Sequence, residues 1–270
     1  MRYKSATTLL FFVLAFIFIL LLLILKGDYW YFLIIPFIVC VVGLLAFKSP
    51  IDRYFFKYQE VGFVDKIQAM LKIEYPIIET FSPEKQKEFY DRLFYFMYER
   101  NSYLVTEETE DLEMLHSLII CAPGVILSME GKKDEGKDIQ RIAAYKHPFP
   151  SPKMKFLHAA EYDEEDGVII VSLEQMIMSQ RNPESYFPIT YFMWAERKVA
   201  VSGGFPTVPK GFDEKFQELW GFTQKSAESF MGYELRNLPA MAICAYMLRR
   251  ENLDALFPGF SSEIKNYLRA

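Results

Sequence analysis

The chain has 270 residues, of which 51% are hydrophobic and 24% charged, and its formal net charge at pH 7 is −5. This acidic balance argues against nucleic acid as a partner, because a polyanion is bound by basic surfaces. The three cysteines include no Cys-x-x-Cys pair, so neither a disulfide framework nor a cysteine zinc site is indicated.

Two uncharged, strongly apolar runs lie at the N-terminus. They cover residues 6–25 and 29–47, and the polar turn Lys26-Gly27-Asp28 separates them. A helix of about 20 residues spans a hydrocarbon core of about 30 Å and satisfies its own backbone hydrogen bonds in lipid. The sequence therefore predicts a transmembrane hairpin over residues 1–50, with the lipid bilayer as a partner.

Alternative interpretations of the hairpin fit the sequence less well. A cleaved signal peptide has an apolar core of about 7–15 residues and a small-residue cleavage site, whereas the first run is longer and leads into a second one. A buried soluble hairpin would show a polar face, which neither run has. The flanking cations Arg2, Lys4, Lys48, Arg53 and Lys57 predict that both ends are cytoplasmic, which makes the chain an integral membrane protein with a cytoplasmic domain.

Residues 51–60 form a basic and aromatic juxtamembrane segment, and residues 61–270 are predicted to form one soluble domain. Helical spacing predicts helices over 61–74, after Ser82, and from Thr106 to the break at Pro123-Gly124. Strands are expected at 141–146, 154–162 and 168–171, followed by helices at 172–178, 184–201, 213–220, 237–251 and 261–268. The predicted fold class is α+β, with helices around a small sheet.

Candidate metal ligands are few. Histidine occurs only at 116, 147 and 158, and the sequence contains no His-Glu-x-x-His. His158 and Glu161 would share a face if they lay on a helix, and His147 could complete a metal site. On the strand predicted here the two side chains would point to opposite faces, which favours a histidine beside an acidic turn.

Several short segments follow one another in a distinctive order. They are Tyr75-Pro76, Phe81-Ser82-Pro83-Glu84, Ser117-Leu-Ile-Ile-Cys-Ala-Pro-Gly-Val-Ile-Leu127, Tyr145-Lys-His-Pro-Phe149 and Gly167-Val-Ile-Ile-Val-Ser-Leu173. In this order they resemble the MtfA-like zinc peptidases over residues 60–257. The resemblance implies a mostly helical, zincin-like domain with a small sheet.

The resemblance also implies a particular catalytic helix. In the family this helix carries His-Glu-Phe-Ala-His, in which two histidines hold zinc and the glutamate activates water. The similar stretch here is Tyr191-Phe192-Met193-Trp194-Ala195, and the later helix at 237–250, which should carry a glutamate ligand, contains no acid. The resemblance therefore implies a degenerate site with no catalytic residue, metal or cofactor, formed by Tyr191, Phe192, Trp194, Ala195 and Cys244.

These observations lead to one functional prediction and two alternatives. The prediction is a membrane-anchored, catalytically inactive relative of a zinc peptidase that binds a protein partner or a small ligand. One alternative is an active metal-dependent peptidase using His147, His158 and Glu161. The other is a structural membrane protein that acts through its hairpin.

Overall fold

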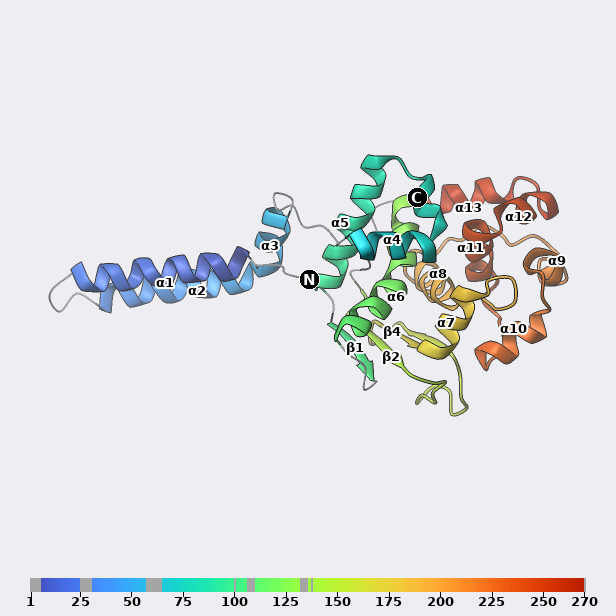
Figure 1. The fold of residues 1–270 in the computed structure, drawn as a ribbon, viewed down its shortest axis with the longest axis horizontal. Helices are drawn as coiled ribbons and strands as arrows, with labels where there is room; N and C mark the ends of the chain where they lie inside the picture. The colour runs from blue at the N-terminus through green and yellow to red at the C-terminus, as the bar shows by residue number, and fades with distance from the viewer. Residues whose placement is uncertain are drawn as a thin grey trace. The chain divides into compact units, whose positions relative to one another are not determined.

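The computed structural model describes residues 6–24, 31–56, 65–99, 101–105, 110–131, 136 and 138–269. The chain divides into two compact units, Met1–Lys66 and Ile67–Ala270. Both are seen in Figure 1. Thr106 and the turn Lys26-Gly27-Asp28 lie outside the described residues.

Unit 1 is a helical hairpin closed by a third helix. Helices α1 (Ala6–Ile24) and α2 (Tyr31–Ala46) lie side by side, and α3 (Lys48–Phe56) follows (Figure 1). The Phe18 and Phe37 rings stack with their centroids 4.3 Å apart. The buried carboxylate of Asp52 accepts hydrogen bonds from the amide and hydroxyl of Thr7, at 2.9 and 2.8 Å. An anion in this place is favourable because it faces the positive end of the α1 dipole.

The prediction of a transmembrane hairpin is wrong. Within the described part of the chain, no helix is both long enough and apolar enough to cross a bilayer. The predicted orientation and the integral membrane location rested on those spans and are wrong with them.

Unit 2 begins with two helices that follow their sequence signals. After α4 (Asp65–Glu74) and the short 3₁₀ helix η2 (Pro76–Thr80), helix α5 runs over Pro83–Glu99. The Lys85 amide donates to the Ser82 hydroxyl at 3.3 Å, so the predicted start at Ser82 is confirmed. The spacing that predicted α5 places Phe89, Leu93 and Phe96 in the core.

Helix α6 (Glu110–Glu130) does not stop at Pro123-Gly124, where the sequence predicted a break. Proline has no amide hydrogen, so the carbonyl four residues earlier, Ile119, loses its helical donor. The Tyr75 hydroxyl donates to that carbonyl at 2.5 Å, and the Trp194 indole donates to the next one, Ile120, at 2.7 Å. The Tyr75 hydroxyl thus replaces the donor that Pro123 lacks, the Trp194 indole adds a second side-chain donor one residue further on, and the helix continues.

The sheet has the order β1-β2-β4-β3, formed by β1 (Asn101–Val105), β2 (Arg141–Tyr145), β4 (Val168–Ser172) and β3 (Ala160–Asp163). Strands β1, β2 and β4 are parallel, with Ala144 opposite Val171, and β3 runs antiparallel to β4. The predictions at 141–146 and 168–171 are confirmed.

The strand predicted over 154–162 is wrong in its first half. Strand β3 begins only at Ala160, and before it the chain makes one isolated bridge, between Phe149 and His158. The partner segment carries prolines at 148, 150 and 152. Proline cannot donate to a ladder, so a continuous pairing cannot form there.

The C-terminal part is helical. Its elements are α7 (Leu173–Arg181), α8 (Ile189–Ser202), α9 (Phe216–Trp220), α10 (Gln224–Met231), α11 (Leu238–Leu248), α12 (Arg250–Leu256) and α13 (Phe260–Arg269). The prediction missed α10, joined α11 to α12 and began α8 five residues early. Pro188 explains the last error, because the residue before a proline is kept out of helical conformation.

Helix α8 is the centre of unit 2. It packs against α6, α11 and β3, while α9 to α13 gather on the side away from β1 and β2 (Figure 1). The unit is mostly helical with a small mixed sheet, as the sequence predicted.

Substitution of Gly124 tests the contact between α6 and α8. A Cβ at Gly124 would lie 2.5 Å from Cδ2 of the Trp194 indole. We expect Gly124→Ala to lower the free energy of unfolding by about 1–3 kcal/mol, because overpacking displaces the indole and its hydrogen bond. Urea denaturation followed by tryptophan fluorescence measures the effect. Gly43→Ala in α2 is the matched control, since no atom lies within 4 Å of its new methyl group; equal stability of both variants would contradict the prediction.

Candidate functional site

The residues of the predicted degenerate site lie together in the core. Tyr191, Phe192, Trp194 and Ala195 are all buried on α8, and Cys244 is buried on α11, which packs along α8. Cys244 is close enough to Tyr191 to help burial in raising the pKa of that phenol. Tyr191 and Cys244 therefore face each other across the contact between α8 and α11.

This arrangement does not fit a peptidase zinc ion. Such an ion needs three nitrogen, oxygen or sulfur ligands from the protein, whereas α8 offers a phenol, a phenyl ring and a methyl group at these places. Burial, and next the Glu196 carboxylate, hold the pKa of the Cys244 thiol well above its ordinary value, so it is not the thiolate that binds metals. In the described residues no three His, Cys, Asp or Glu side chains are placed to share a metal ion.

The three candidate metal ligands divide into two places. His158 Nε2 lies 3.2 Å from Glu161 Oε2, and both side chains are buried. The expectation that they point to opposite faces is wrong, because the regular strand begins after His158. His147 is exposed and contacts Glu174 instead, at 3.0 Å from Nδ1 to Oε2.

Sequence reasoning missed a polar cluster that extends from the buried His158 and Glu161 to the half-buried Glu196, Tyr233 and Asn237. Asn237 Nδ2 donates to Glu196 Oε1 at 3.4 Å, and the Tyr233 phenol lies near the carboxylates of both glutamates. Burial raises the pKa of Glu196 to about 7 and that of Tyr233 well above its ordinary value. The sequence signal that could have indicated this cluster is Glu196, an acid that directly follows the apolar run of α8. We call these five residues the Glu196 cluster.

His158 is held in the Glu196 cluster through both ring nitrogens. Its Nδ1 lies 3.0 Å from the Phe156 carbonyl, which only accepts, so Nδ1 carries a hydrogen. Its Nε2 faces the Glu161 carboxylate.

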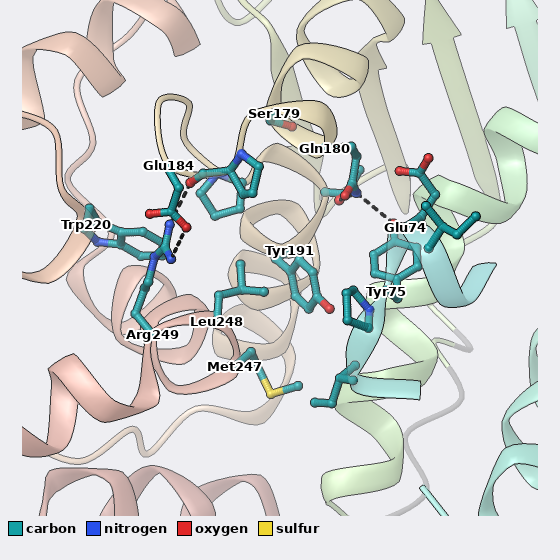
Figure 2. A pocket seen from close by; sticks show the side chains of 16 residues that line it. Glu74, Tyr75, Ser179, Gln180, Glu184, Tyr191, Trp220, Met247, Leu248 and Arg249 are labelled. Atoms are coloured by element: carbon teal, nitrogen blue, oxygen red, sulfur yellow. Dashed lines mark hydrogen bonds and ion pairs between the residues drawn. The ribbon is translucent and has the colours of Figure 1, made fainter. Parts of the chain in front are cut away.

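A pocket of about 350 Å³ opens at the N-terminal end of α8. Its lining comes from α4, η2, the end of α7, the start of α8, α9 and the end of α11, as Figure 2 shows. Most of the wall is apolar, from Ile73, Pro76, Ile77, Pro183, Pro188, Trp220, Met247 and Leu248. The remaining lining residues are Glu74, Tyr75, Ser179, Gln180, Glu184, Thr190, Tyr191 and Arg249. We call it the Tyr191 pocket.

One side of the Tyr191 pocket is fixed by a hydrogen-bond chain. The Tyr75 hydroxyl donates to the Ile119 carbonyl and accepts from Gln180 Nε2 at 2.9 Å. Gln180 Nε2 also lies 3.4 Å from Thr190 Oγ1. The Tyr75 and Tyr191 rings meet edge to face with centroids 6.0 Å apart, so the chain positions Tyr191 as well.

The Tyr191 hydroxyl has no hydrogen-bond partner among the residues that the structure describes. The residue is 5% exposed, and in Figure 2 its hydroxyl points toward the Tyr75 side of the pocket. The hydroxyl is not enclosed, because the buried side-chain polar atoms that lack a partner in the described chain are His116 Nδ1, Trp220 Nε1, Tyr246 Oη and Ser261 Oγ. It faces the pocket, where a ligand atom can pair with it.

Comparison with known proteins found no matching family model, no matching curated protein and no matching solved structure. The resemblance to MtfA-like peptidases therefore stays a prediction.

The Glu196 carboxyl should make stability depend on pH. Between its ordinary pKa of 4.5 and the folded value of about 7, the unfolded chain releases this proton while the folded chain keeps it. The free energy of unfolding therefore falls as the pH rises through this window, by about 3 kcal/mol in all. Glu196→Gln should remove the loss and be more stable than the wild type at about pH 8.

Urea denaturation between about pH 4 and pH 8 measures this difference. Glu251→Gln on α12, whose side chain is exposed, is the control and should follow the wild-type profile. A Glu196→Gln variant with the wild-type pH profile would show that the carboxyl titrates normally.

Proposed function

We propose that unit 2 is a non-catalytic, peptidase-like domain that binds a ligand in the Tyr191 pocket. The observation that carries the proposal is the Tyr191 side chain itself. It stands where the resemblance would put a zinc-binding histidine, and its hydroxyl faces a cavity with no partner among the described residues.

The case against catalysis is chemical. A peptidase of the zinc type needs a metal-bound water and a carboxylate base beside it. Phe192 stands in the place of that base, and the described residues hold no metal-binding group of three. The alternative set is divided between two places, since His147 pairs with Glu174 while His158 pairs with Glu161, which favours the non-catalytic proposal.

The case for binding is the form of the cavity. Ligand pockets occupy about 300–1,000 Å³ and combine apolar walls with a few fixed polar groups. The Tyr191 pocket has a volume of about 350 Å³, and Tyr75, Gln180 and Thr190 form its fixed polar side. A site whose polar groups are already oriented pays little ordering entropy when a ligand binds.

The absence of zinc chemistry can be tested on the purified full-length chain. We expect no stoichiometric zinc by elemental mass spectrometry and no cleavage of casein or of a fluorogenic peptide library, because the required ligands are missing. One tightly held zinc ion per chain, or cleavage abolished by a chelator, would contradict the non-catalytic assignment.

Filling the Tyr191 pocket tests the binding site. Ile77, in η2, lines the pocket, so Ile77→Trp should occupy part of its volume and abolish binding of fragments that the wild type retains. Ligand-observed NMR with a mixed library of neutral and charged fragments gives the measurement. Val201→Trp, at an exposed position on α8 outside the lining, is the control. Wild-type protein that retains no fragment, or fragments bound equally by both variants, would overturn the site.

A further inference from the structure

We infer that the Tyr191 pocket recognises a neutral secondary amide carried on an apolar group. The Tyr191 hydroxyl would donate to the amide carbonyl, and the Gln180 side-chain oxygen would accept the amide N–H. This inference rests on the proposed function and names the ligand class of the same site.

The donor is the Tyr191 hydroxyl. Its side chain lines the cavity and is 5% exposed, while the hydroxyl itself is open to the cavity and has no partner in the described chain. Burial raises the pKa of this phenol above its ordinary value, so the group keeps its proton and stays neutral. A hydroxyl in that state is matched best by a ligand oxygen that accepts, such as a carbonyl.

The acceptor follows from the hydrogen-bond chain of Tyr75. The Tyr75 hydrogen is used on the Ile119 carbonyl, which can only accept, so the Tyr75 oxygen must receive its second bond from a donor. The Gln180 group that faces Tyr75 is therefore the NH₂, at 2.9 Å, and the orientation of the amide is fixed. This leaves Gln180 Oε1 as an acceptor with no partner among the described residues of the pocket.

Charge compensation at the rim disfavours ionic ligands. Arg249 donates to a Glu184 carboxylate oxygen and to the Pro183 carbonyl, each at 2.8 Å, so its guanidinium is engaged. It is the one cation among the described lining residues. Burial raises the pKa of Glu74, and the nearby Arg181 acts in the opposite direction. Each rim carboxylate thus has an arginine close by, and a charged ligand would be desolvated without a free counter-ion.

The apolar walls select the rest of the ligand. Three prolines and four aliphatic side chains surround the polar pair, so an apolar group beside the amide would bury its surface there. A peptide segment with an apolar side chain and a small amide-bearing molecule both present this chemistry.

Matched probes separate the possibilities. N-acetyl-leucine N-methylamide is neutral. N-acetyl-leucine has the same side chain with a negative carboxylate, and leucine N-methylamide has the same side chain with a positive ammonium group. Titration of the full-length chain by ligand-observed NMR should give a dissociation constant about tenfold lower for the neutral probe than for either charged one. Tyr191→Phe should weaken the neutral probe about tenfold, because it removes only the donor. Tyr186→Phe, outside the lining, should leave binding unchanged.

Each outcome decides a separate point. Equal affinity for neutral and charged probes, or unchanged affinity in Tyr191→Phe, would overturn the amide assignment. The pocket itself would still be supported if fragments bind the wild type and do not bind Ile77→Trp. Binding of acetyl-Ala-Leu-Ala amide more tightly than the single-residue probe supports the assignment with a peptide as the source. Equal binding of the two supports it with a small molecule as the source.

Discussion

The structure of unit 2 depends on how the chain repairs helix α6 at Pro123. Proline removes one helical donor, and an unsatisfied buried carbonyl costs about 1–3 kcal/mol. Tyr75 and Trp194 supply donors to the carbonyls of Ile119 and Ile120. Tyr75 directly precedes η2 and Trp194 lies on α8, so these two hydrogen bonds hold both elements against α6. Gly124 makes the close approach of the indole possible, since its missing Cβ leaves room for the ring.

The hydrogen bonds of Tyr75 also shape the pocket at the start of α8. Tyr75, which donates to Ile119, accepts from Gln180 and packs against the Tyr191 ring. Five residues further along, near the middle of α8, burial raises the pKa of Glu196 to about 7. The helix that would present a metal site in the predicted family instead presents a phenol and a carboxyl that holds its proton up to near-neutral pH.

Local sequence patterns predicted the elements that are fixed by apolar burial alone or by hydrogen bonds between residues close in sequence. The strands at 141–145 and 168–172 and the capped start of α5 belong to this class. The predicted break at Pro123-Gly124 failed because its rescue comes from donors 44 and 74 residues away. The Gln180–Tyr75 bond joins residues 105 apart, so no spacing rule could show that Tyr191 faces a cavity. The transmembrane prediction relied on hydropathy alone and took helix length from the apolar runs.

The two polar sites of unit 2 differ in how far their groups satisfy one another. In the Glu196 cluster, His158 Nε2 faces the Glu161 carboxylate and Asn237 donates to Glu196, so four of its five residues pair within the protein. In the Tyr191 pocket, Tyr75 is fully bonded, but the neighbouring phenol and the Gln180 oxygen have no partner among the described residues. A fixed polar group that faces a cavity is available to a ligand, which is why the proposed binding site is the pocket and not the Glu196 cluster.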